Sequence, residues 1–197
     1  MTVKKTETIE IPRIEIGYLE ILLIGDSPLI MHKWSEKAKK EMLDKQMKVA
    51  KKGREAKDPQ RDFEDSIYHH PDGGYGFPSV AFKNAAVSAC RFTDGTKMTV
   101  ARGAFHVEGE FVKIEGAEPS PREDMVRVGM GTADIRYRAE FKGWKANVKL
   151  SYNKHALSSA QIVNLFNLAG FGVGIGEWRP EKDGQFGRFH VANETEV

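Results

Sequence analysis

The pattern of apolar and polar residues near the start of the chain predicts a buried strand followed by an exposed helix. Residues 14–24 are rich in Ile and Leu and lead into Gly-Asp-Ser-Pro, which is typical of a strand that ends at a turn. Ser35 is a candidate N-cap for a run of helix formers that reaches about Gly53. Few residues in this run are apolar, so we expect a narrow apolar stripe on a lysine-coated helix. The polar residues 53–61 contain Asp-Pro and predict a loop.

Farther along the chain, the period of the apolar residues changes from helical to alternating. Small apolar residues recur at helical spacing over residues 79–91, which predicts a helix that packs closely against a sheet. Strands are predicted over residues 104–114 and 125–128, with Pro119 and Pro121 in the connection between them.

The clearest strand pair is predicted on either side of Gly143. Apolar and charged residues alternate over residues 135–141, and the alternation resumes over residues 144–152. Each segment is therefore predicted to be a half-buried strand with one apolar and one mainly basic face. The basic positions are Arg136, Arg138, Lys142, Lys145 and Lys149.

A glycine-rich segment follows a third predicted helix, which begins with a capping box at Ser158 and ends at Gly170. A dinucleotide-binding fingerprint opens a helix, whereas this segment precedes a last predicted strand at residues 188–191. It also lacks the Gly-Lys-Ser/Thr of a phosphate-binding loop. Two interpretations of the glycines remain. In the first, they let the backbone approach a ligand closely beside Arg179 and Arg188. In the second, they are needed only for the tight turns of a hairpin.

Composition indicates a globular protein of 197 residues, 40% of them hydrophobic and 29% charged. No apolar stretch approaches the roughly 20 residues that a membrane-spanning helix needs. The polar N-terminal residues lead into no apolar signal core, so we expect a cytoplasmic protein. Cys90 is the single cysteine, which excludes an internal disulfide and a cysteine-based zinc site.

The net charge of +2 conceals a basic segment. Residues 33–61 contain eleven Lys and Arg against five Asp and Glu, which gives this segment a net charge of +6 and leaves −4 for the rest. Lysines on a helix and a following loop suit contacts with phosphates that do not depend on sequence. A solvated helix face, supported by ion pairs between neighbouring turns, is the alternative interpretation.

Aromatic residues in irregular segments suit stacking on bases, and the candidates are Trp34, Phe77 and Trp178. Signals for catalysis are weak, because the six histidines show no metal-ligand spacing. His32 and His155 are candidate general bases for RNA cleavage. We expect no cofactor and no metal.

Two stretches resemble the RAMP superfamily of CRISPR ribonucleoproteins. Gly76-Phe-Pro-Ser-Val-Ala-Phe-Lys-Asn-Ala-Ala is similar to the family's proline and small residues at the start of its first core helix. Gly174-Ile-Gly-Glu-Trp-Arg through Phe186-Gly-Arg-Phe resembles the glycine-rich loop near the C-terminus of that family. This chain departs from the family at residues 177–180, Glu-Trp-Arg-Pro, where the family has small and hydroxyl residues.

This resemblance implies an α+β fold with a ferredoxin-like, RRM-type antiparallel sheet and two core helices. Residues 1–197 would form a single RAMP-like domain. A basic helical insertion is expected at about residues 33–61 and a protruding β-hairpin at about residues 119–138.

The predicted function is non-catalytic binding of single-stranded RNA or DNA by a protein that forms homo-oligomers along the strand. The protein would be a subunit of a ribonucleoprotein or a stand-alone relative from a phage or mobile element, with no membrane partner. The alternatives are a metal-independent endoribonuclease on the same fold, or a self-assembling structural protein of a phage or mobile element. The predicted contact residues are Lys37, Lys40, Lys48, Lys51, Lys52, Arg54, Arg136, Arg138, Gly174, Gly176, Trp178, Arg179 and Arg188.

Overall fold

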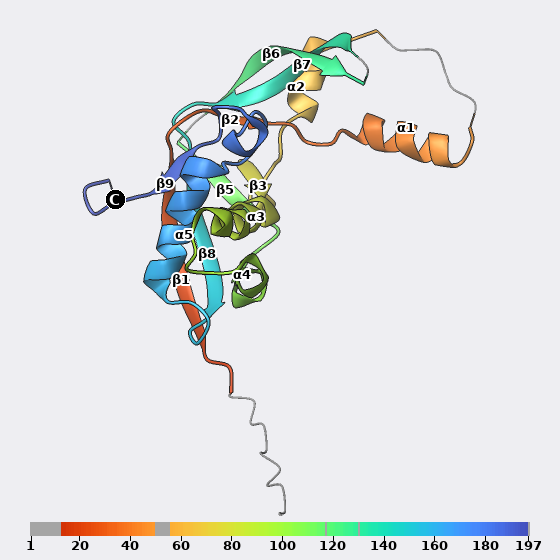
Figure 1. Cartoon of the computed structure of the whole chain (residues 1–197). Coiled ribbons are helices and arrows are strands. Elements are labelled where there is room, and N and C mark those ends of the chain that lie inside the picture. The colour runs from red at the N-terminus through yellow and green to blue at the C-terminus, as the bar shows by residue number, and fades with distance from the viewer. Residues whose placement is uncertain (1–12, 50–55, 117, 130, 197) are drawn as a thin grey trace, which may run out of the picture.

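The computed structural model describes residues 13–49, 56–116, 118–129 and 131–196. Within these ranges the chain forms two antiparallel sheets and five α-helices (Figure 1). No helix in these ranges is long and apolar enough to cross a membrane.

The larger sheet has the strand order of a ferredoxin-like fold. β1 (Ile16–Gly25) lies between β8 (Lys145–Asn153) and β9 (Phe189–Val191), and β5 (Phe111–Glu115) pairs with β8. All of these pairs are antiparallel. The spatial order β5–β8–β1–β9 places the second, third, first and fourth core strands side by side, as in a βαββαβ unit. This order confirms the predicted fold class.

Two helices cover one face of this sheet. α3 (Ser79–Ala89) follows β1 in the core order, and α5 (Ser159–Gly172) follows β8 (Figure 1). The buried residues of α3 include three alanines, which let the helix pack closely as predicted. The largest fully buried side chains of the core are Trp144, Phe82, Phe105, Phe141, Phe166 and Phe189.

α5 begins as predicted but ends later. Ser158 and Gln161 form the predicted capping box. Gly170, however, lies inside the helix, and a Cβ atom there would overlap the carbonyl oxygen of Phe189. Glycine at this position therefore lets α5 approach β9, and the prediction that Gly170 ends the helix was wrong.

The smaller sheet contains a projecting hairpin. β6 (Pro119–Val128) and β7 (Thr132–Phe141) pair along their whole length, and β2 (Leu29–Met31) pairs with the root of β7. The predicted pairing across Gly143 does not form, because β7 and β8 belong to different sheets. The two prolines predicted to lie in a connection are part of β6 instead. β6 is an edge strand, where a missing backbone donor is tolerated.

The remaining elements are inserted between those of the core. They are α1 (Glu36–Gln46), α2 (Pro59–Asp65), β3 (Tyr75–Pro78), η1 (Cys90–Phe92), α4 (Met98–Ala104), β4 (Phe105–Val107) and η2 (Pro180–Lys182). The segment predicted as one strand over residues 104–114 begins at the last residue of α4 and contains β4 and the first part of β5.

The basic insertion differs in detail from the prediction. α1 ends at Gln46, well before Gly53, and Lys48 has a φ of 56° that is incompatible with further helix. Residues 53–61 were predicted to form a loop, but α2 begins within them. Asp58 caps α2 by accepting a hydrogen bond from the Arg61 amide at 3.1 Å, and the proline after it suits the first helical position.

His190 ties the C-terminal residues to the turn after β1. Its Nδ1 lies 2.6 Å from Asp26 Oδ1, and its Nε2 lies 3.2 Å from Glu196 Oε1. Burial disfavours the charged imidazole, but hydrogen bonds to both carboxylates and their charges raise the pKa of His190 above its ordinary value.

The close approach of α5 to β9 predicts that Gly170→Ala destabilises the protein by about 1–3 kcal/mol. The matched control is Gly103→Ala in α4, where a Cβ atom would meet nothing within 4 Å. Alanine there should be neutral or stabilising by up to about 1 kcal/mol. Urea denaturation of both variants measures the difference. Equal midpoints for the two variants would contradict this account of Gly170.

The raised pKa of His190 predicts a pH-dependent contribution to stability. The charged imidazole stabilises the fold fully below its unfolded pKa of about 6.5, and the contribution is lost as pH rises through the higher folded pKa. The stability difference between wild type and His190→Gln should therefore be largest near pH 5–6 and shrink above neutrality. Thermal denaturation across pH measures it, with His155→Gln in an exposed turn as control. A difference that grows with pH would overturn the assignment.

Candidate functional site

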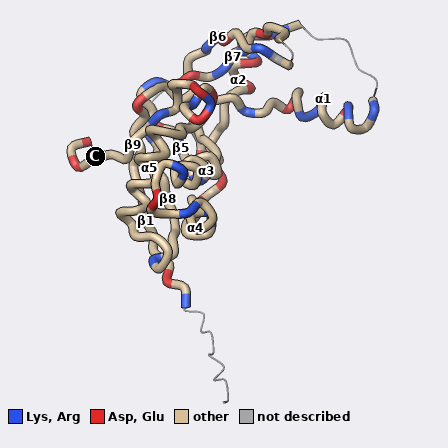
Figure 2. The backbone as a smooth tube through the Cα atoms, viewed as in Figure 1, with Lys and Arg blue, Asp and Glu red and all other residues tan. Residues whose placement is uncertain are grey.

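α1 projects away from the core as a basic arm, defined here as residues 33–49. Figure 1 and Figure 2 show the helix lying apart from the sheets, with Lys and Arg along it. None of its described side chains is buried, and within the described residues Lys40 and Lys48 have no carboxylate partner. These two lysines are therefore free to meet an external anion.

The arm also carries an apolar stripe without a partner in the described chain. Met42, Leu43 and Met47 are 48%, 54% and 65% exposed. The sequence predicted a narrow apolar stripe on this lysine-coated helix. The structure shows it exposed, because the arm leaves the core.

The root of the arm lies beside the glycine-rich loop. His32, directly after β2, places its Nδ1 3.6 Å from Glu177 Oε1. Trp34 lies two residues after His32 and Trp178 directly follows Glu177, with 50% and 40% of their surfaces exposed. Trp178 has a φ of 54°, a left-handed conformation that is uncommon for a bulky residue. The contact thus brings two exposed tryptophans to the root of the arm.

The glycines of this loop mainly allow the chain to pack against itself and against β2. The Glu177 amide donates to the Ile30 carbonyl at 3.0 Å, and the Gly187 amide donates to the Pro28 carbonyl at 2.8 Å. Gly176 has a φ of 78°, and a Cβ atom there would lie 2.6 Å from the Ile30 oxygen. These contacts favour the tight-turn interpretation and leave fewer amides for a ligand.

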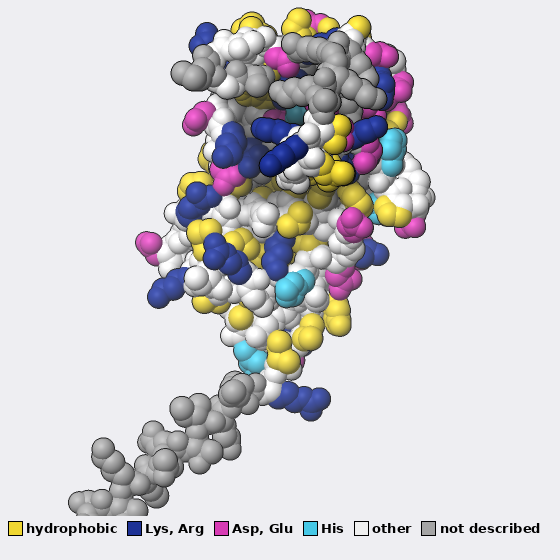
Figure 3. Space-filling model, turned by 90° about the vertical axis from the view of Figure 1, so that its right-hand side faces the viewer, with side chains coloured by type: hydrophobic (Ala, Val, Ile, Leu, Met, Phe, Trp, Pro, Cys, Tyr) yellow, Lys and Arg dark blue, Asp and Glu magenta, His cyan; other side chains and the backbone are white. Residues whose placement is uncertain are grey.

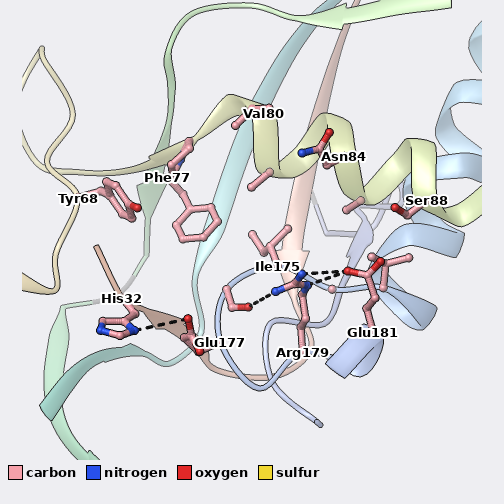
Figure 4. A pocket seen from close by; sticks show the side chains of 16 residues that line it. His32, Tyr68, Phe77, Val80, Asn84, Ser88, Ile175, Glu177, Arg179 and Glu181 are labelled. Atoms are coloured by element: carbon pink, nitrogen blue, oxygen red, sulfur yellow. Dashed lines mark hydrogen bonds and ion pairs between the residues drawn. The ribbon is translucent and has the colours of Figure 1, made fainter. Parts of the chain in front are cut away.

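A cleft of about 330 Å³ lies between α3 and the glycine-rich loop (Figure 4). Gly174 and Gly176 line it from the loop, and Asn84 and Ser88 line it from α3. Sequence reasoning did not identify this pair on α3. The available signal was their spacing of four residues on the polar side of an otherwise small-residue helix.

Three of the predicted arginines already have carboxylate partners. Arg179 Nε and Nη2 donate to Glu181 Oε2 at 3.2 and 3.0 Å (Figure 4). Arg136 Nε lies 3.0 Å from Asp134 Oδ2. Each of these two carboxylates also pairs with a second cation, so both arginines are held in ion-pair networks within the protein.

Arg138 is the third predicted arginine with a carboxylate partner. It is buried at the root of the hairpin and is only 5% exposed. Its Nη1 donates to Asp124 at 3.4 Å, its Nη2 lies 3.8 Å from Glu177 Oε2, and its Nε has no partner in the described residues. The hydrogen bond with His32 and then the charge of Arg138 lower the pKa of Glu177, against the effect of burial. Arg138 therefore links the hairpin to the glycine-rich loop, and we leave it out of the contact surface.

Arg188 supports the same region through its backbone. Its amide donates to Ser27 Oγ at 3.0 Å, and its side-chain Nε is buried without a partner in the described residues. Lys51, Lys52 and Arg54 lie outside the described residues, as does the side chain of Lys37.

Other candidates for stacking and catalysis do not gather at one place. Phe77 is 6% exposed and packs edge-on against Tyr68 and Phe82, so it belongs to the core. His32 follows β2, whereas His155 follows the end of β8 that pairs with the start of β1. The ten-residue β1 is roughly 33 Å long, and His155 lies by its start whereas β2 follows its end.

No described group of His, Cys, Asp and Glu has the geometry of a metal site. Cys90 is buried, and this burial raises the pKa of its thiol.

No protein-family model matches the sequence, and no curated protein matches it. Among solved structures, the crystal structure of Cmr6 from Pyrococcus furiosus is similar in shape, with a TM-score of 0.43 at 8% sequence identity. The similarity covers 91% of this chain and 100% of that chain.

The contact of Glu177 with Arg138 predicts that Glu177→Ala destabilises the protein by about 1–2 kcal/mol, because the buried guanidinium loses one of its two carboxylates. Glu41→Ala, on the exposed face of α1, is the control and should change stability by less than about 0.5 kcal/mol. Thermal denaturation measures both. If the two variants have equal stability, Glu177 does not hold Arg138.

Proposed function

We propose that this protein binds single-stranded nucleic acid at the root of the basic arm, without catalysing a reaction on it. The observation that carries the proposal is the contact between His32 and Glu177, because Trp34 lies two residues after His32 and Trp178 directly follows Glu177, at the root of the arm that carries unpaired lysines. Exposed aromatic rings beside free cations are the two components that non-specific single-strand binding requires.

Each component has a separate role. The lysines of α1, among them Lys40 and Lys48, would contact phosphates and release counterions, so that affinity falls with salt. The ring of Trp178 would stack on a base, which every base permits because each has a π-face. These contacts do not distinguish RNA from DNA, since neither involves a 2′-hydroxyl group.

Oligomerisation along the strand forms part of the proposal. Met42, Leu43 and Met47 are about half exposed or more on the arm, and a neighbouring copy would bury them. The motif resemblance to the RAMP superfamily is consistent with such an assembly, as a ribonucleoprotein subunit or as a stand-alone protein of a mobile element.

The proposal predicts salt-dependent binding of labelled single-stranded RNA and DNA. Fluorescence anisotropy should show the logarithm of affinity falling linearly with the logarithm of salt concentration, by about 0.7 for each phosphate contacted. Trp178→Ala should weaken binding roughly tenfold or more, because stacking on an aromatic ring contributes about 1–3 kcal/mol. Lys40→Ala should lower the salt slope without changing base preference.

Tyr18→Ala is the matched control, because Tyr18 is 75% exposed on the strand β1, away from the arm. It should bind as the wild type does. No binding at low salt, or a flat salt response, would refute the proposed function. Loss of binding in Tyr18→Ala alone would move the site to the sheet and refute its place at the arm.

A further inference from the structure

A second cavity lies next to the cleft at the root of the arm. This second cavity has a volume of about 480 Å³ and shares three lining residues with the first: Tyr68, Pro78 and Val80. The two cavities are therefore neighbours around the start of α3, and together they are called the groove below. Figure 3, which looks at the molecule from the side of the arm, shows Lys and Arg side chains spread among hydrophobic ones on this face.

Two basic side chains meet at the far end of this groove. Lys83 Nζ, from α3, lies 3.1 Å from Nδ1 of His106, from β4. An ammonium group can only donate a hydrogen bond, so the imidazole accepts at Nδ1 and carries its proton on Nε2. The remaining Lys83 protons and this Nε2–H group are donors, which an anionic acceptor would complement.

Lys83 differs from the arginines discussed above because it has no carboxylate partner. No carboxylate of the described residues forms an ion pair with Lys83, whereas Arg179 and Arg136 are both paired. Glu110 is the carboxylate among the residues that line the second cavity, and its backbone carbonyl accepts a hydrogen bond from the Ser79 amide. A cation paired only with a neutral ring is available to a phosphate.

We propose that Lys83 and His106 form a second phosphodiester contact, so that a strand bound at the tryptophans continues along the groove to this pair. The inference rests on the proposed function and adds residues that lie outside the arm. It makes binding depend on length: a short oligonucleotide occupies only the root of the arm, whereas a longer one also reaches Lys83.

Anisotropy titrations with single strands of about 4 to about 16 nucleotides test this arrangement. Lys83→Ala and His106→Ala should each weaken binding of the longest strands about threefold to tenfold, and the Lys83 variant should lower their salt slope by about 0.7. Neither variant should affect the shortest strands. Glu110→Gln should strengthen binding of long strands, because it removes a negative charge from the groove.

Lys97→Ala is the control, since Lys97 is exposed before α4 and lines neither cavity. It should leave binding unchanged at every length. Lys83→Arg should retain long-strand affinity, which separates loss of the cation from damage to α3. Unfolding midpoints equal to that of the wild type verify that each variant is folded.

The outcomes distinguish this inference from the proposed function. Unchanged affinity of Lys83→Ala for long strands, together with weakened binding by Trp178→Ala, would overturn the second contact and retain the first. Equal losses at all lengths would place Lys83 at the primary contact and overturn the two-contact arrangement. If the wild type binds no strand of any length, both proposals fail.

Discussion

The close packing of the glycine-rich loop on β2 is the constraint on which the rest of the candidate site depends. Backbone hydrogen bonds join Glu177 to Ile30 and Gly187 to Pro28. Gly176 permits this approach, since any side chain there would meet the Ile30 carbonyl. Because β2 also pairs with β7, one loop holds the core, the hairpin and the start of the arm in register.

The packing of the loop also determines which cations are paired with carboxylates. A guanidinium that packing draws partly out of water must be compensated, because an unpaired buried charge is costly. Arg138 accordingly lies between Asp124 and Glu177, and Arg179 is held by Glu181. Lysines on the arm stay in water and need no such partner. The cations available for a ligand are therefore lysines of the arm, and not the arginines that the sequence pattern predicted as contacts.

Local patterns in the sequence identified much of the fold. The alternation over residues 144–152 predicted β8, and the capping box at Ser158 predicted the start of α5, because both depend on near neighbours in the chain. The same reasoning placed Phe77 in an irregular segment, although tertiary packing buries it between Tyr68 and Phe82. Local reasoning also predicted that α5 ends at Gly170. Glycine is needed there because a side chain would overlap the Phe189 carbonyl, which belongs to a strand distant in sequence.

For the candidate site, the sequence by itself determined the inventory: a basic segment at residues 33–61, two tryptophans outside the predicted strands and helices, and a glycine-rich segment before the last strand. Their grouping was decided by tertiary structure alone. His32 and Glu177 are far apart in the chain, and only the packing of the loop on β2 brings them to 3.6 Å. Ion pairing of Arg136, Arg138 and Arg179 likewise depends on strand pairing and loop closure, since each carboxylate partner must be positioned in space and no periodic pattern encodes that position.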